Sequence, residues 1–155
     1  MKLVKGMTVA SLVFAGLSGL AISSTAYAGN RTFVFDPGQL TWSAYENGQL
    51  VKSGRASGGS NYCRDLGRSC HTPSGVFSVS RKGGPDCRSS LYPKPNGGAW
   101  MGYCMFFSGS YAIHASNAVP NYNASHGCIR VTPAAAQWLS ANFIQYGTKV
   151  VVKSY

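Results

Sequence analysis

Acidic residues are scarce in this 155-residue chain, which has four Asp and Glu against 14 Lys and Arg, a formal net charge of +10 at pH 7. Charged residues of both signs make up only 12% of the sequence, and no heptad pattern is sustained, so a coiled coil is excluded. Hydrophobic residues reach 45%, which is too many for a long disordered protein. Nineteen Gly and seven Pro indicate many turns, and the length predicts one domain.

The longest hydrophobic run lies at the N-terminus and is typical of a secretory signal peptide. Two Lys residues precede an apolar stretch over residues 7–22, which is shorter than the roughly 20 residues needed to span a bilayer. A small-x-small cleavage pattern then ends at Ala28. We therefore expect residues 1–28 to be removed on export and residues 29–155 to form the mature domain, with no stable membrane anchor.

The predicted mature part keeps a strong positive charge, because only two Lys residues lie in the signal peptide. Charge of this sign favours anionic partners. For an exported protein, cell-wall carboxylates, teichoic acid or anionic lipid fit better than nucleic acid, which we do not expect as a partner. A solvated basic surface is the alternative interpretation.

All five cysteines lie in the predicted mature part, where export permits disulfides. An odd number leaves at least one thiol unpaired unless chains pair. The simplest pairing joins Cys63 to Cys70 across a short Arg-rich segment, and Cys87 to Cys104 across a Pro- and Gly-rich stretch. Cys128 is then the free thiol. The spacing matches no structural zinc pattern, so we expect no metal, and no cofactor is indicated.

Short strand patterns separated by turns predict a mostly-β domain. The expected strands cover residues 32–35, 40–45, 50–53, 76–80, 100–107, 111–113 and 149–152. Asn47-Gly48 between the second and third of these predicts a type I′ hairpin turn.

One helix is expected late in the chain. Thr132 can cap it, Pro133 suits its first position, and Gly147 follows its expected end near Tyr146. The residues predicted to form its buried face are Ala136, Leu139, Phe143 and Tyr146.

The segment SHGCIR, residues 125–130, gathers three chemically active side chains. If it is extended, His126, Cys128 and Arg130 lie on one face, while the alternate residues face the core. An imidazole, a thiol and a guanidinium on one face are hard to explain as packing. A cationic neighbour such as Arg130 should lower the pKa of the Cys128 thiol and raise its thiolate fraction.

A thiol nucleophile also needs a base within hydrogen-bond reach. His114 follows an apolar dipeptide at a predicted strand end, and residues 117–123 have loop composition. A strand–loop–strand connection can therefore bring His114 to Cys128. No Asp or Glu lies near either residue in the sequence, so we expect a backbone carbonyl to orient His114.

These residues resemble the catalytic motif of the YkuD-type L,D-transpeptidases, in which a His is followed by a loop and SHGC-x-R. Residues 72–77 (TPSGVF) are similar to the family's TP-x-G-x-F segment, and residues 147–150 (GTKV) to its G-T-x-V strand. The resemblance covers roughly residues 32–153. It implies a β-sandwich-like L,D-transpeptidase catalytic domain, here with one late α-helix and disulfide-stapled loops.

The resemblance implies a bacterial cell-wall enzyme with Cys128 as the nucleophile and His114 as the proton acceptor and donor. The residues implied to shape the site and the oxyanion pocket are Ser125, His126 and Gly127. Arg130 would orient the loop or meet a substrate carboxylate. The implied reaction cleaves the bond between the third residue and D-Ala of a peptidoglycan tetrapeptide stem. Cys128 holds the acyl group as a thioester, and an amine of another stem or water takes it.

The Cys-rich region of residues 63–104 is not a general feature of the family. We expect it to form a disulfide-pinned rim that limits which acceptor enters. Its cationic residues Arg64, Arg68, Arg81, Lys82, Arg88 and Lys94 would either meet cell-wall carboxylates or form a solvated surface.

Two other interpretations stay open. A hydrolase of the same fold, either an L,D-carboxypeptidase or a cross-link cleaver, would pass the acyl group to water. A non-catalytic wall-binding module would use Cys128 in redox or pairing roles. We expect a periplasmic monomer, with secretion or attachment to the cell wall as alternatives, because disulfides beside a free thiol suit a compartment that has thiol-handling enzymes.

Overall fold

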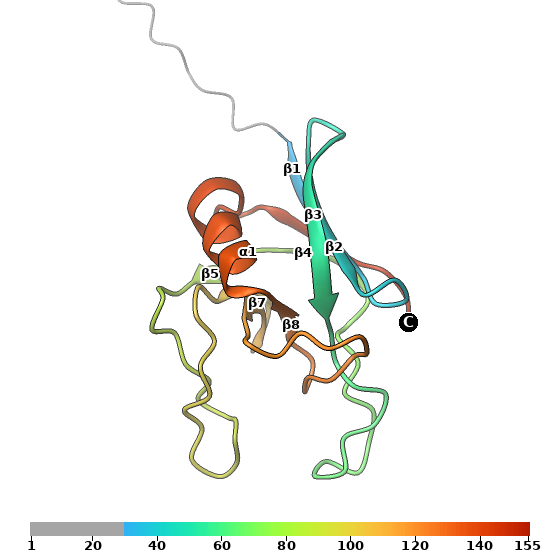
Figure 1. The fold of residues 1–155 in the computed structure, drawn as a ribbon, viewed down its shortest axis with the longest axis vertical. Coiled ribbons are helices and arrows are strands. Elements are labelled where there is room, and N and C mark those ends of the chain that lie inside the picture. Colours follow the sequence, from blue (N-terminus) through green and yellow to red (C-terminus); the bar gives the residue numbers. More distant parts are fainter. Residues whose placement is uncertain (1–29) are drawn as a thin grey trace, which may run out of the picture.

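The computed structural model describes residues 30–155, so the predicted signal peptide at residues 1–28 lies outside the described part of the chain (Figure 1). The strands are β1 (Arg31–Asp36), β2 (Thr41–Glu46), β3 (Gln49–Ser57), β4 (Gly75–Ser78), β5 (Arg81–Lys82), β6 (Met105–Ser108), β7 (Tyr111–Ala115), β8 (Ile129–Val131) and β9 (Lys149–Val152). The helical elements are α1 (Pro133–Trp138) and the π-helical turn η1 (Leu139–Phe143). The prediction of a mostly-β domain with one late helix is confirmed. Neither helical element within residues 30–155 is long and apolar enough to cross a membrane.

The strands form one curled sheet in the order β4-β9-β1-β2-β3-β8-β7-β6-β5. β4 and β5 stand at opposite ends of this order, although only Val79 and Ser80 separate them in the sequence. The amide of Val79 donates to Thr148 O at 3.0 Å, and the amide of Ser80 donates to Phe106 O at 2.9 Å. These two residues therefore link the sheet's two ends, and the sheet has to curl to bring those ends together.

The hydrophobic core fills the inside of this curl. Phe33 and Phe35 alternate along β1 with half-buried residues and are fully buried, as strand periodicity requires. Trp42 of β2 stacks on Phe33 with ring centroids 6.1 Å apart and on Trp138 of α1 at 6.4 Å. The aromatic rings thus join the helix to the sheet.

The predicted hairpin is confirmed, since Asn47 and Gly48 both have positive φ, 53° and 81°, as a type I′ turn requires. β3 runs past the expected end at residue 53 to Ser57. Its last residues pair with β8, where Ser57 lies opposite Arg130. The hairpin's second strand therefore positions the segment that carries the SHGCIR motif, residues 125–130.

The helix begins as predicted. Thr132 Oγ1 accepts a hydrogen bond from the amide of Ala135 at 3.3 Å, and Pro133 occupies the first position. These two residues satisfy the local requirements of a helix N-terminus.

The helix ends earlier than predicted, at Phe143, and the prediction that Tyr146 lies on the buried face is wrong. Ile144 is extended and fully buried, whereas Tyr146 is 68% exposed. Lys82 Nζ donates to the carbonyl oxygens of Ser140 and Ile144, at 2.7 Å each. This ammonium from β5 satisfies carbonyls at the end of the helix and holds the chain where it leaves the helical path.

The prediction of a strand over residues 100–107 is only partly right, because β6 begins at Met105. Residues 102–103 form a turn instead. The amide of Met101 donates to Cys87 O at 2.8 Å, and Tyr103 has a φ of 56°. The neighbouring Cys87 segment binds these backbone groups, which are therefore not available for a sheet ladder.

Candidate active site

β7 and β8 pair in parallel and bring the two halves of the motif together, with His114 opposite Arg130. Cys128 directly precedes β8. Burial alternates as predicted for an extended segment: His126, Cys128 and Arg130 are half-buried, whereas the alternate residues Gly127, Ile129 and Val131 are buried. Strand pairing therefore places the His114 imidazole, the Cys128 thiol and the Arg130 guanidinium on one side of the sheet.

These three side chains line a cavity of about 650 Å³. Its other walls come from β5, from the segment closed by Cys87 and Cys104, and from the turn between β6 and β7. Arg81, Lys82 and Arg88 add positive charge, and none of the four acidic residues, all within residues 30–155, contributes to the lining. The cavity is therefore suited to an anionic ligand.

The His114 ring is 6% exposed and has a fixed orientation. Its Nδ1 lies 2.8 Å from the carbonyl oxygen of Ala115, so Nδ1 carries the proton and donates it. The expectation that a backbone carbonyl orients this ring is met. Burial lowers the pKa of His114 to about 4, and the charge of Arg130 acts in the same direction, against a hydrogen bond to Ala115 that raises it. Near neutral pH the imidazole is neutral, and Nε2 has a free lone pair.

The Cys128 thiol is a resting thiol rather than a thiolate. Burial raises its pKa, while a backbone hydrogen bond with Ala112 and the charge of Arg130 lower it by less. The Sγ–H group faces the carbonyl oxygen of Ser110 at 3.8 Å. Arg130 lowers the thiol pKa as expected, but the expected rise in the thiolate fraction is wrong, because desolvation outweighs the attraction of this half-buried guanidinium.

Ser125 and Gly127 lock the turn that presents Cys128. The hydroxyl of Ser125 donates to the carbonyl oxygen of Cys128 at 2.6 Å and accepts from the amide of Gly127 at 3.0 Å. Gly127 has a φ of 118°, and a Cβ at this position would collide with the ring of Tyr111. Only glycine fits both the backbone angle and the space.

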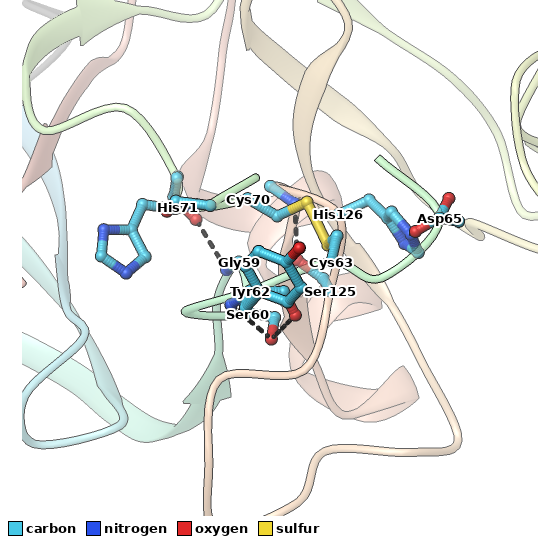
Figure 2. The surroundings of a disulfide bond; sticks show 12 residues. Gly59, Ser60, Tyr62, Cys63, Asp65, Cys70, His71, Ser125 and His126 are labelled. Carbon is cyan, nitrogen blue, oxygen red and sulfur yellow. Dashed lines mark hydrogen bonds and ion pairs between the residues drawn. A yellow bond between two sulfur atoms is a disulfide. The ribbon is translucent and has the colours of Figure 1, made fainter. Parts of the chain in front are cut away.

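His126 points toward Asp65, in the segment between Cys63 and Cys70 (Figure 2). Its Nε2 lies 2.9 Å from Oδ1 of Asp65, and its ring stacks on Tyr92 with centroids 4.2 Å apart. The hydrogen bond from His126 is the main reason that the pKa of Asp65 lies below its ordinary value. This pairing was not predicted, because 61 residues separate the two partners and no local signal connects them.

The predicted disulfides Cys63–Cys70 and Cys87–Cys104 are both present, and Cys128 is the free cysteine of the described residues. Two long loops, drawn in green and yellow, extend from the same end of the sheet in Figure 1. Each contains one of the disulfides. The Cys-rich region thus lies on two sides of the segment that carries Cys128.

The model of the L,D-transpeptidase catalytic domain family (YkuD) matches residues 30–152. The chain belongs to this family. The match covers the described strands, the helix and every predicted site residue. No curated protein matches the chain.

Solved L,D-transpeptidase structures share the fold. One from Xylanimonas cellulosilytica is 30% identical and superposes with a TM-score of 0.68, covering 80% of this chain and 60% of its own. One from Mycobacterium tuberculosis is 20% identical, with a TM-score of 0.66, covering 81% of this chain and 58% of its own. An L,D-transpeptidase solved in complex with imipenem is 21% identical, with a TM-score of 0.66, and the coverage is 80% and 59%. The chain therefore spans about 60% of the length of these proteins.

Proposed function

We propose that this protein is a peptidoglycan L,D-transpeptidase, a cysteine acyltransferase that works on tetrapeptide stems. One observation carries the proposal. The thiol of Cys128, the neutral imidazole of His114 and the guanidinium of Arg130 line the same 650 Å³ cavity, in a chain whose family is that of L,D-transpeptidase catalytic domains.

In the acylation step, Nε2 of His114 takes the thiol proton as Cys128 Sγ attacks the carbonyl carbon of the third stem residue. The imidazolium then gives this proton to the departing nitrogen of D-Ala as the C–N bond breaks. D-Ala leaves with a neutral amine, and the acyl group stays on sulfur as a thioester. A neutral resting pair suits this step, because both proton transfers start from and return to an uncharged imidazole.

In the second step, an amine of another stem attacks the thioester. His114 accepts the proton from this amine and gives it to Cys128 Sγ as the C–S bond breaks, so the thiol leaves while the new amide forms. The amide of Gly127 is engaged by Ser125, so we assign the oxyanion contact in this turn to the amide of Cys128 itself. Arg130 would meet a carboxylate of the stem.

The protein is proposed to act outside the cytoplasm, in the periplasm. Two disulfides in a domain of this size fit an oxidising compartment. The net positive charge of the chain would favour its association with the carboxylates of the cell wall.

The test is a mass-spectrometric time course with purified disaccharide-tetrapeptide. Wild-type protein is expected to release D-Ala and form cross-linked dimers, and the Cys128→Ala variant to do neither. Tripeptide monomers without dimers would identify a carboxypeptidase instead. Binding of the stem without turnover, by protein whose thiol is confirmed to be reduced, would identify a binding module.

A carbapenem offers a second probe of the same nucleophile. One structural relative was solved with imipenem. We propose that imipenem acylates Cys128 in this protein, and the expected result is a mass increase of one drug molecule in wild type and none in Cys128→Ala.

A further inference from the structure

The two disulfide-closed loops are joined through His126. Asp65, between Cys63 and Cys70, faces Nε2 of His126 at 2.9 Å (Figure 2). Tyr92, between Cys87 and Cys104, stacks on the same imidazole at 4.2 Å. We call the group of Asp65, His126 and Tyr92 the clasp.

Each side of the clasp is tied to ordered backbone. The amide of Ser60 donates to Ser125 O at 2.8 Å, and the amide of Cys70 donates to Ser60 O at 3.0 Å. These bonds attach the loop closed by Cys63 and Cys70, the first loop, to Ser125, the residue that precedes His126. On the other side, the amide of Tyr92 donates to Ser89 Oγ at 2.9 Å. The contacts of His126 therefore arise from two loops with fixed local structure.

The clasp lies between two cavities. A second cavity of about 170 Å³ adjoins the cavity that holds Cys128. Both are lined by Leu91, Tyr92, Ser110, Tyr111 and His126. The residues that only the second cavity uses come mostly from the first loop, among them Arg68 and His71. Tyr92 stacked on His126 is thus part of the wall that separates the two spaces.

A metal site does not explain this group. The sulfur of Cys63, a carboxylate oxygen of Asp65 and a ring nitrogen of His126 all lie within 4.8 Å of one another, close enough to bind one metal ion together. That sulfur is bonded to Cys70 and is not a thiolate, which is the form that binds metals. The contacts of Asp65 and His126 are therefore best understood as contacts between loops.

We propose that Asp65 is a positioning residue for the transfer step: it holds His126 against Tyr92, and the closed clasp keeps the thioester cavity separate from the second cavity. With the clasp closed, water does not reach the thioester from the second cavity, and the acyl group goes to an amine. With the clasp open, the two cavities merge, and hydrolysis of the thioester increases relative to transfer to an amine. This inference rests on the proposed transpeptidase function.

The decisive measurement is the ratio of cross-linked dimer to hydrolysed tripeptide. Asp65→Ala removes the hydrogen-bond acceptor that faces His126 Nε2, and Asp65→Asn replaces the carboxylate with a neutral acceptor. Asp86→Ala is the matched control, since Asp86 is an exposed Asp in the other loop. We expect Asp65→Ala to lower the ratio about two- to fivefold, as the loss of one solvent-exposed contact allows, with Asp65→Asn in between. Equal ratios in Asp65→Ala and Asp86→Ala would overturn the proposal.

A second readout does not need turnover. Cys128 is alkylated with iodoacetamide and with a bulky maleimide, and the two rates are compared within each variant. An open clasp raises the rate with the bulky reagent relative to the small one in Asp65→Ala and Tyr92→Ala but not in Asp86→Ala. If the wild type shows no transpeptidation, the proposed function fails while this comparison still decides whether the clasp exists. Unchanged rate ratios in both clasp variants would refute it.

Discussion

The carbonyl oxygen of Ala115 accepts a hydrogen bond from Nδ1 of the preceding residue, His114, at 2.8 Å. A chain neighbour thus has the orienting role that a carboxylate has in many Cys–His sites. Because the acceptor is neutral, it fixes the tautomer without adding a charge that would hold a proton on the ring. The resulting base is weak and uncharged, and this property determines the expected pH dependence.

The rate of Cys128 acylation should remain high well below neutral pH. The pKa of His114 is lowered to about 4, so the ring is neutral, and able to accept a proton, above that value. The rate of thioester formation should therefore fall as the pH drops through about 4. Circular dichroism at each pH separates this loss from unfolding. A loss centred near 6.5, the ordinary value for His, would contradict this assignment.

Replacing His114 with Gln should slow acylation by about 10²- to 10⁴-fold, the usual contribution of a general base. Gln retains an amide that can reach the Ala115 carbonyl, but this amide is not basic enough to take the thiol proton. The measurement is the single-turnover rate of D-Ala release. A loss below about tenfold would show that His114 is not the proton acceptor.

Alkylation of Cys128 by iodoacetamide should increase through the alkaline range, with a midpoint above that of an ordinary thiol. Burial raises the pKa of Cys128, and the charge of Arg130 partly opposes it. Arg130→Met should move the midpoint still higher, because it removes the opposing charge. Arg64→Met makes the same change in net charge on an exposed residue and should leave the midpoint in place. A wild-type midpoint below neutral pH would indicate a resting thiolate and contradict the prediction.

Gly127→Ala should reduce turnover more than tenfold. A left-handed backbone angle costs a residue with a Cβ about 1–2 kcal/mol, and the collision with Tyr111 adds about 1–3 kcal/mol of overpacking. Gly109→Ala is a matched control, since Gly109 also has positive φ, 52°, but a Cβ added there would have no atom within 4 Å. If both variants lose the same activity, the contact with Tyr111 does not matter.

Lys82→Met should lower the free energy of unfolding by about 1–3 kcal/mol, because the ammonium donates to two carbonyl oxygens at the end of the helix. Chemical denaturation measures the change. Lys149→Met, at an exposed lysine on β9, should have little effect. An equally small effect at Lys82 would show that these two hydrogen bonds contribute little.

The sequence predicted the parts of the fold that depend on local patterns. The short strand pattern of residues 32–35 located β1, the dipeptide Asn47-Gly48 located the hairpin, and Thr132 with Pro133 located the start of the helix. The end of the helix was misjudged because it depends on Lys82, an ammonium that arrives from a strand 58 residues earlier in the sequence. Local periodicity carries no information on such a partner.

The same distinction holds in the candidate site. The spacing within residues 125–130 gave the shared face of Cys128 and Arg130, since alternation is a local property. The direction of the thiol's pKa shift was misjudged because it depends on burial under other segments. The pairing of Asp65 with His126 was missed because only the folded loops bring them together.

The position of β9 in the sheet has a consequence for how the domain is assembled. This last strand lies between β1, the first strand, and β4, and pairs with both. β4 in turn leads through Val79 and Ser80 to β5, which forms part of the cavity wall. During synthesis, which starts at the N-terminus, this half of the sheet therefore cannot be completed until residues 149–152 have been made. Most of the contacts between residues of the described structure are long-range in sequence, so slow, all-or-none formation of the domain is expected rather than growth from one end.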